Sequence, residues 1–237
     1  MQVSFFDFAL LIETPAIRAD LAFFRQIGFL KDPAEPEGMT ALSDRSLRIL
    51  LRHSTRARTS LILYCTHIDG VEAAHRRFRH GLHYVAQDRP VLNARTFLDD
   101  PEGVRTFLVE QLRHEHPVSG QAPGLVCGTF SNLRLVTRHA EATRAHYGTL
   151  GFRERSYRQQ HAKLCRCLNT DLLMLCICAA VPETTVSAGR LAITYVDESV
   201  TTIIDRLQGL GVSVSTDALS GAAKLRSPGG QVILLGN

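Results

Sequence analysis

An internal repeat constrains the fold of this chain more than any other feature of its sequence. Residues 9–29, ALLIETPAIRADLAFFRQIGF, align without a gap with residues 132–152, NLRLVTRHAEATRAHYGTLGF. An aromatic residue, Phe24 or Tyr147, stands at the same offset in each, and a Gly-Phe pair follows it at the same distance. Both segments predict a strand, a short turn, an amphipathic helix and a glycine that caps the helix before the next strand. The chain is therefore expected to contain duplicated structural units.

Two other stretches match each other more loosely. In each, an apolar strand precedes a helical segment that is followed by glycine, and a turn containing proline and glycine precedes a last strand. The predicted strands are 61–64 and 105–110 in one stretch and 191–196 and 231–235 in the other, with helices at 71–78 and 200–207 and turns at Asp100-Pro101-Glu102-Gly103 and Ser227-Pro228-Gly229-Gly230.

Together the four stretches predict an α+β fold of four β-α-β-β-β units, paired into two open half-barrel lobes. Residues 1–118 would form the N-terminal lobe and residues 125–237 the C-terminal lobe. The segment 117–124 is rich in Pro, Gly and Ser and is expected to link the two halves. Because the chain already holds both pairs of units, it can complete this arrangement as a monomer or associate as a homodimer.

The composition fits a globular protein and argues against several classes of partner. Of the 237 residues, 45% are apolar and 21% are charged, and the formal net charge is +4. The arginines are scattered, so nucleic-acid binding, which needs a clustered basic patch, is not expected. The longest apolar run, residues 172–181, is far shorter than the roughly 20 residues of a membrane span. The N-terminus lacks the basic region of a secretory signal, so we expect a cytoplasmic protein with reduced thiols.

The order of these motifs resembles the vicinal oxygen chelate superfamily, which includes glyoxalases, bleomycin-resistance proteins and extradiol dioxygenases. The resemblance rests on the aromatic-x-x-x-Gly-Phe ends of two helices and on the two turns before the last strands, and it spans nearly the whole chain. It implies that paired units curl into an open sheet whose concave face forms the active cavity. It also implies a divalent metal, held by His and Glu, that acts on the substrate as a Lewis acid.

The metal-ligand positions that the resemblance implies hold residues unsuited to that task. These positions open the first strand of a unit or lie on its last strand, beyond the turn. They are occupied by Ala9, Leu63, Phe107, Asn132, Leu191 and Leu234. Five of these side chains are apolar, and one amide alone is a poor ligand for a hard cation. The sequence therefore predicts no metal. It also predicts no other cofactor, because it contains no dinucleotide-binding, Walker or nucleophile-elbow motif.

Strand alternation predicts which side chains face the cavity. From the implied ligand positions, they are Ala9, Leu11 and Glu13 in the first unit, Leu63, Cys65 and His67 in the second, Asn132, Arg134 and Val136 in the third, and Leu191, Ile193 and Tyr195 in the fourth. A largely apolar surface with a few convergent polar groups is typical of a small-molecule site. The predicted ligand-binding residues are Asn132, Arg134, Glu13, Tyr195 and Phe107, and the candidate catalytic residues are His67, Arg134 and Tyr195.

Each charged candidate has a functional interpretation and a simpler structural one. Arg134 suits a carboxylate or enolate oxygen, and His67 or Glu13 suits proton transfer. The competing interpretation is that these side chains only contact water at the strand ends.

Four of the six cysteines form two Cys-x-Cys pairs, Cys165 with Cys167 and Cys176 with Cys178, on two predicted strands. Asn169-Thr170-Asp171 between them predicts a hairpin turn. Alternation places both members of each pair on one face, so the cysteines either pack in the sheet or form a soft-metal site or a redox pair. Packing is favoured, because structural zinc sites more often use Cys-x-x-Cys on turns.

The sequence thus favours a metal-independent small-molecule binding protein of the glyoxalase and bleomycin-resistance type. The alternative is a metal-free lyase, isomerase or cyclase of the same fold, working by general acid/base chemistry, for example in natural-product metabolism. A third hypothesis is a scaffold that acts only through protein contacts.

Overall fold

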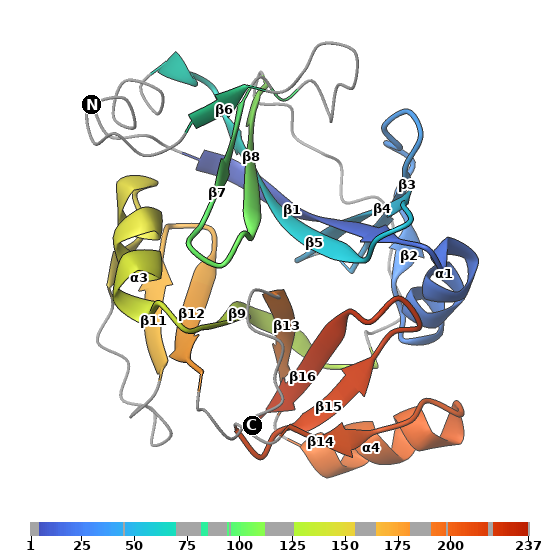
Figure 1. Ribbon diagram of the computed structural model, residues 1–237. Helices are drawn as coiled ribbons and strands as arrows, with labels where there is room; N and C mark the ends of the chain where they lie inside the picture. The colour runs from blue at the N-terminus through green and yellow to red at the C-terminus, as the bar shows by residue number, and fades with distance from the viewer. Residues whose placement is uncertain are drawn as a thin grey trace.

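The computed structural model describes residues 5–44, 46–69, 82–84, 94, 96–111, 126–154, 165–180, 191–197, 199–217 and 220–236. Its strands form two eight-stranded sheets, one from each half of the chain (Figure 1). The N-terminal half contains β1 (Phe5–Thr14), α1 (Ile17–Gln26), β2 (Leu30–Lys31), β3 (Thr40–Ser43), β4 (Arg48–His53), β5 (Arg58–Cys65), β6 (Leu82–Tyr84), β7 (Thr96–Asp99) and β8 (Arg105–Glu110). The C-terminal half contains β9 (Thr129–Thr137), α3 (Ala140–Thr149), β10 (Arg153–Glu154), β11 (Cys165–Asn169), β12 (Met174–Ala179), β13 (Leu191–Val196), α4 (Val200–Gly209), β14 (Ser215–Thr216), β15 (Ala223–Arg226) and β16 (Val232–Gly236).

Both sheets have the same topology. The strand orders are β2-β3-β4-β1-β5-β8-β7-β6 and β10-β11-β12-β9-β13-β16-β15-β14. In each unit the first strand pairs in parallel with the last, and the first strands of two units meet antiparallel at the centre of the sheet. The predicted α+β fold of paired half-barrel lobes is therefore confirmed. The lobe boundaries, 1–118 and 125–237, stay a prediction, and the predicted helix 71–78 and linker 117–124 lie outside the described residues.

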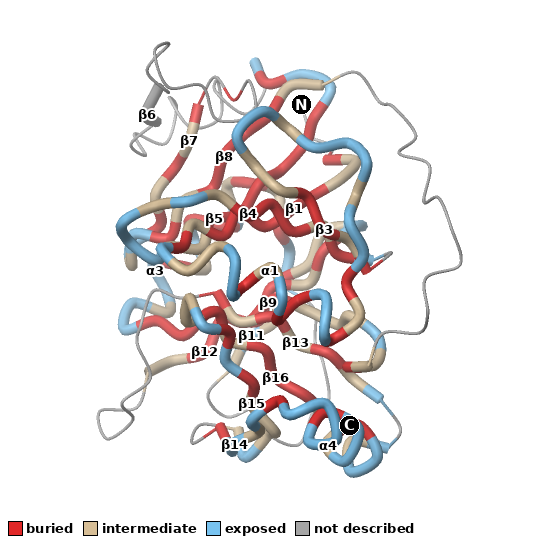
Figure 2. Tube along the Cα trace, turned by 90° about the vertical axis from the view of Figure 1, so that its right-hand side faces the viewer, coloured by how far each residue is buried: buried red, intermediate tan, exposed pale blue. Residues whose placement is uncertain are grey.

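The repeated aromatic residues explain why the helices lie on the sheets. Phe24 of α1 and Tyr147 of α3 are fully buried, in one apolar cluster that includes side chains from both sheets. Burying a large apolar side chain contributes about 1.5–3 kcal/mol, so each aromatic fixes its helix. Gly28 and Gly151, with φ of 104° and 88°, end the two helices as predicted. Figure 2 shows the central strands as buried, whereas α4 is largely exposed. No helix in the described ranges is long and apolar enough to cross a membrane.

The hairpin before the last strand of every unit is closed by the same device. Asp44, Asp100, Thr170 and Ser227 each stand at the start of that turn. Their side-chain oxygens accept hydrogen bonds from backbone N–H groups a few residues further on. Short side chains with an oxygen suit this task because they reach their own turn. The predicted Asp-Pro-x-Gly and Ser-Pro-Gly-Gly turns are thus two examples of one fourfold feature.

Two of these turn residues also join the lobes. Tyr195 of β13 donates its phenolic hydrogen to Asp44 Oδ2. Tyr147 of α3 donates to Asp100 Oδ2 at 3.4 Å. In both contacts a tyrosine of the C-terminal lobe meets a carboxylate of the N-terminal lobe.

The turns also dock at helices of the opposite lobe. Glu102, in the β7–β8 turn, accepts hydrogen bonds from Thr137 Oγ1 and from the Arg138 N–H, just before α3. In the other direction, the Gly229 N–H of the β15–β16 turn donates to Asp20 of α1 at 2.7 Å. Polar contacts from each lobe to the other, together with the shared apolar cluster, therefore hold the two lobes together.

Candidate functional site

We call the face of each sheet that is turned away from its described helices the inner face. In the N-terminal sheet, this face is filled by its own side chains. Ala9, Ile62 and Phe107 form one row across β1, β5 and β8, because Ala9 pairs with Ile62 and Ile62 pairs with Phe107. Their exposed fractions are 0%, 0% and 3%, and they belong to an apolar cluster with Leu11 and Tyr64. The predicted ligand residue Phe107 is therefore part of a packed core.

The equivalent row of the C-terminal sheet is polar and partly open. Asn132, Thr194 and Leu234 lie side by side on β9, β13 and β16, and Lys224 of β15 follows them in register. Leu234 is buried, but the other three are only half-buried. The Oγ1 atom of Thr194 is itself buried and has no hydrogen-bond partner among the described residues. Asn132 donates from Nδ2 to Ser131 Oγ at 3.1 Å.

Arg134 is a charged residue of this face, two residues along β9 from Asn132. Its Nη1 atom lies 3.2 Å from Asp217 Oδ2, and the two side chains are only 10% and 8% exposed. Ser220 supports Asp217, donating to the same oxygen from its hydroxyl at 2.6 Å and its N–H at 3.0 Å. Burial lowers the pKa of Arg134, and the charge of Asp217 opposes that effect. The buried Arg134 Nε has no hydrogen-bond partner within the described ranges, so the guanidinium is only partly satisfied.

The predicted inner-face residues of the second and fourth units are wrong. Leu63 and Cys65, and likewise Leu191, Ile193 and Tyr195, lie in the apolar cluster on the helix-covered side. Ala9 pairs with Ile62, one residue from the predicted Leu63. Asn132 pairs with Thr194, three residues from the predicted Leu191. A slip of one residue moves every side chain of a strand to the other face. The predictions for the first and third units, which place Ala9 and Asn132 on the inner face, agree with the structure.

The three candidate catalytic residues are not brought together. Tyr195 is fully buried on the helix-covered side, and burial, followed by the nearby charge of Asp44, raises the pKa of its hydroxyl well above 10.0. His67 is exposed in the bend that follows β5. Arg134 alone of the three lies on the inner face of the C-terminal sheet.

Glu13 lies on the inner face of the N-terminal sheet, where Arg52 satisfies it. Arg52 Nη2 lies 2.8 Å from Glu13 Oε1 on the neighbouring strand. This cross-strand ion pair contradicts the interpretation that Glu13 contacts only water, and it leaves Glu13 poorly placed to move a proton.

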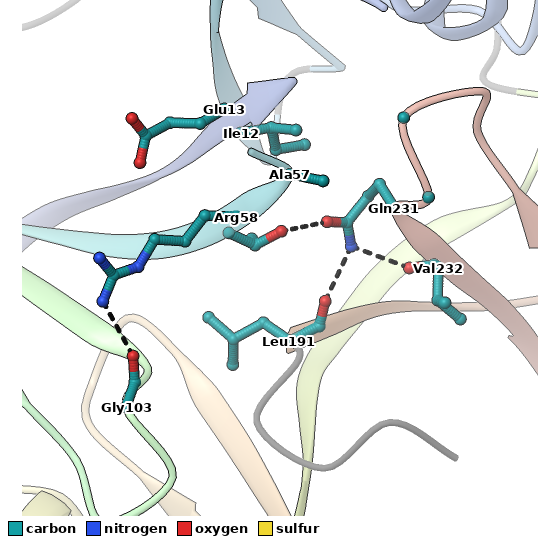
Figure 3. Close-up of a pocket in the computed structure, with 11 residues that line it drawn as sticks. Ile12, Glu13, Ala57, Arg58, Gly103, Leu191, Gln231 and Val232 are labelled. Atoms are coloured by element: carbon teal, nitrogen blue, oxygen red, sulfur yellow. Dashed lines mark hydrogen bonds between the residues drawn. The ribbon is translucent and has the colours of Figure 1, made fainter. Parts of the chain in front are cut away.

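A pocket of about 160 Å³ lies between the lobes beside Glu13 and Arg58 (Figure 3). Gln231 crosses it, accepting from Thr59 Oγ1 at 2.6 Å and donating to the carbonyl oxygens of Leu191 and Val232 at 2.8 and 3.0 Å. Figure 3 also shows Arg58 reaching the Gly103 carbonyl, at 3.0 Å. Ligand pockets usually measure about 300–1,000 Å³, and the polar groups here already have partners. The volume suits a few water molecules better than an organic ligand.

The residues of the inner faces do not fit the divalent metal that the resemblance implies. The central rows hold Ala9, Ile62 and Phe107 in one sheet and Asn132, Thr194 and Leu234 in the other. Neither row contains a carboxylate, imidazole or thiolate, the groups that bind such ions in proteins. In the part of the chain that the structure describes, where Cys165, Cys167, Cys176 and Cys178 are held in disulfides, no three His, Cys, Asp or Glu side chains are grouped to hold a metal ion.

Two sheets in which the first and last strands of each unit pair in parallel have the topology of the vicinal oxygen chelate fold, and solved structures with that fold match nearly the whole chain. A halotolerant catechol dioxygenase is 14% identical, with a TM-score of 0.67, over 100% of this chain and 87% of the other. Homoprotocatechuate 2,3-dioxygenase from Brevibacterium fuscum, in complex with 3,4-dihydroxyphenylacetate, is 13% identical, with a TM-score of 0.69, over 99% and 81%. An Mn(II)-bound glyoxalase from Novosphingobium aromaticivorans is 13% identical, with a TM-score of 0.63, over 99% and 82%. At these identities the likeness establishes the fold. No family model matches the sequence, and no curated protein matches it.

Sequence reasoning missed two residues of the C-terminal inner face, for different reasons. Thr194 could have been found by pairing β13 antiparallel with β9 from Asn132 outward. Asp217 could not, because its contact with Arg134 joins residues 83 positions apart through a loop. No local pattern marks such a partner.

Proposed function

We propose that the protein is a metal-independent small-molecule binding protein, which holds an organic ligand with an anionic oxygen on the inner face of its C-terminal sheet. The observation that carries the proposal is the pair of unsatisfied buried atoms, Arg134 Nε and Thr194 Oγ1. A buried polar atom without a partner costs about 1–3 kcal/mol, so a ligand that supplies an acceptor recovers that energy. Apolar neighbours such as Val136 and Leu234, both buried, would contact the rest of the ligand.

The chemistry of the site supports a carboxylate or an enolate as the anionic group. The guanidinium of Arg134 presents several donors in a fixed plane, which matches the two oxygens of a carboxylate. Asp217 occupies only Nη1, so other donors stay open to a ligand. The aromatic acid bound by one structural neighbour, 3,4-dihydroxyphenylacetate, has this combination of an apolar ring and a carboxylate and is a suitable first probe.

The alternative is a metal-free lyase, isomerase or cyclase of the same fold. It needs a proton donor or acceptor on the inner face beside Arg134, and His67 and Tyr195 do not lie there. Asp217 lies beside Arg134, but it is already engaged by Arg134 and Ser220. Lys224, in register with Leu234, is another described titratable group of this face. We favour binding because the predicted acid/base residues are spread over different faces.

The test compares two conservative substitutions on equivalent faces. Thr194→Val removes the unsatisfied hydroxyl of the C-terminal sheet, and Ser60→Ala removes the unsatisfied hydroxyl on β5 of the N-terminal sheet. Both should leave the unliganded protein as stable or slightly more stable, because each deletes a buried group without a partner. Only Thr194→Val should weaken binding of 3,4-dihydroxyphenylacetate, by about fivefold for roughly 1 kcal/mol.

Binding is measured by the ligand-induced rise in melting temperature and by calorimetry, in the presence of a metal chelator. A ligand at 100 times its Kd stabilises the fold by about 2.7 kcal/mol. A requirement for an added divalent cation would contradict metal independence. Loss of affinity in Ser60→Ala but not in Thr194→Val would place the site in the other lobe, and a melting temperature unmoved by a panel of aromatic acids would count against the binding function itself.

A further inference from the structure

The two Cys-x-Cys pairs play no part in the proposed ligand site, yet the structure brings all four sulfurs to one face of one hairpin. In the antiparallel pair β11–β12, Cys165 lies opposite Cys178, and Cys167 lies opposite Cys176. The Cα atoms of these pairs are 4.0 and 4.1 Å apart, and each pair is joined as a disulfide. The prediction of reduced thiols is therefore wrong for this hairpin, because its register places each cysteine directly opposite another.

This face is the inner face of the C-terminal sheet. Cys176 is in register with Arg134 on the neighbouring strand β9. The alternate residues of β12, Leu175 and Ile177, lie in the helix-covered cluster, so Cys176 and Cys178 point the other way. A guanidinium on the neighbouring strand favours a thiolate over a thiol, because it stabilises the negative charge on sulfur.

In each pair, the cysteine on β11 is the more exposed of the two. Cys176 and Cys178 are 8% and 1% exposed, whereas Cys165 and Cys167 are half-buried. Small thiols and metal ions can therefore approach each pair. The other two cysteines, Cys65 and Cys127, are buried and unpaired. Burial, followed by the charge of a nearby carboxylate, raises the pKa of the Cys65 thiol to about 11 and that of Cys127 to about 12.

We propose that this hairpin, once its disulfides are reduced, binds one thiophilic divalent cation of the Zn²⁺ class through the four thiolates of Cys165, Cys167, Cys176 and Cys178. A dithiol is the reductant: each disulfide takes two electrons and two protons from one dithiol molecule, which leaves as its own cyclic disulfide. The cation then displaces the four thiol protons. Reoxidation by a disulfide of the same class reforms both cross-strand bonds and releases the ion.

The spacing of the hairpin is compatible with a tetrahedral site. Residues two apart on a strand are about 6.7 Å apart, and the sulfurs of a four-thiolate zinc site are about 3.8 Å apart, given Zn–S bonds near 2.3 Å. Each sulfur must therefore lean about 1.5 Å along its strand, which a change of side-chain rotamer provides. The cross-strand pairs are already close enough. Four sulfur ligands are the set that zinc selects over magnesium and calcium.

The experiment uses the full chain and Co²⁺ as the probe. Protein reduced with a phosphine, which is then removed under anaerobic conditions, is titrated with Co²⁺ and followed by near-ultraviolet thiolate-to-metal absorption. We expect one Co²⁺ per reduced chain, displaced by Zn²⁺, and none in the disulfide form. Replacing both members of one pair, Cys167→Ser with Cys176→Ser, should weaken binding at least about 100-fold, since even residues that only support metal ligands contribute 10- to 100-fold. The matched control, Cys65→Ala with Cys127→Ala, should leave stoichiometry and absorption unchanged.

A second measurement on the unmodified chain covers the case in which a variant fails to fold. Reduced protein with and without Zn²⁺ is alkylated, and each cysteine is located by mass spectrometry. The proposal expects Zn²⁺ to protect the four hairpin cysteines. Unprotected hairpin cysteines, Co²⁺ bound without thiolate absorption, or equal binding by the disulfide form would each overturn it. These measurements follow thiolates and bound metal, not the affinity for an aromatic acid, so failure of this proposal is distinguishable from failure of the proposed ligand site.

Discussion

Replacing Tyr195 by Phe removes one buried hydroxyl where the lobes meet. Tyr195 donates to Asp44 Oδ2, while Asp44 Oδ1 accepts from the N–H groups of Ser46 and Leu47 at 2.9 and 2.7 Å. Because its pKa is raised well above 10.0, the hydroxyl is a neutral donor at ordinary pH. The Phe variant keeps the edge contact with Phe130, whose ring centroid lies 6.0 Å away. The substitution therefore removes the hydrogen bond and little else.

The expected cost follows from the burial of Asp44. A hydrogen bond to a charged group contributes about 1.5–3 kcal/mol, and the value is larger when the abandoned partner stays buried. Asp44 is only 8% exposed, so water replaces the lost donor incompletely, and we expect a cost of about 2 kcal/mol. In a chain of this size 1 kcal/mol moves the melting temperature by about 2–4 °C, so Tyr195→Phe should melt about 4–8 °C lower.

Tyr147→Phe is the matched control in the other interlobe contact. Its bond to Asp100 is longer, at 3.4 Å, so we expect a loss of about 1 kcal/mol or less. Both variants and the parent are compared by scanning calorimetry near neutral pH. Equal shifts in the two variants, or a Tyr195→Phe midpoint indistinguishable from that of the parent, would refute the argument that the Asp44 contact holds the lobes together.

Two further predictions concern the docked turns. Burial raises the pKa of Glu102, but the Arg138 N–H and charge, with other contacts at that turn, outweigh it, and the net pKa lies below the usual 4.5. Ionised Glu102 thus stabilises the fold above pH 4.5, and this stabilisation is lost as the pH falls through the lowered pKa. The melting temperatures of Glu102→Gln and the parent should therefore differ most near neutral pH and converge in acid. Gly229→Ala should lower the melting temperature by several degrees, because the added Cβ would lie 2.2 Å from Asp20 Oδ2. Gly148→Ala in α3, where nothing lies within 4 Å of the added Cβ, should raise it, since Ala favours a helix over Gly by about 1 kcal/mol; a loss from both glycines would show that the clash is not the cause.

The architecture could be predicted because the same local sequence pattern occurs in both halves of the chain. The helices that carry Phe24 and Tyr147 end at glycines with positive φ, and each of these features depends on residues a few positions apart. Once two such units are recognised, the pairing of first and last strands follows from the fold family. Local chemistry of this kind survives in a sequence even when its relatives by fold are only 12–14% identical.

Which face of the sheet each side chain occupies could not be predicted in the same way. Alternation states that residues two apart share a face, but it does not say which face. The pairing with the neighbouring strand decides the face: Ala9 pairs with Ile62, and Asn132 pairs with Thr194. The predicted register began one residue late on β5, and on β13 it took Leu191, three residues before Thr194, as its starting point. Tyr195 is predicted to face the cavity only because alternation was counted from Leu191, four residues before it.

The contrast between the two inner faces explains why a ligand site is expected in one lobe. In the N-terminal sheet the central row is closed, because Ile62 and Phe107 are 0% and 3% exposed and fill the space with their own atoms. A ligand there would have to displace packed side chains, and opening a core costs several kcal/mol for each large residue. In the C-terminal sheet, Asn132 and Thr194 stay half-buried, and two buried polar atoms lack partners. A ligand bound there, as proposed, would supply the missing acceptors. The first copy of the duplicated fold thus has a packed apolar inner face, whereas the second keeps a half-buried polar row.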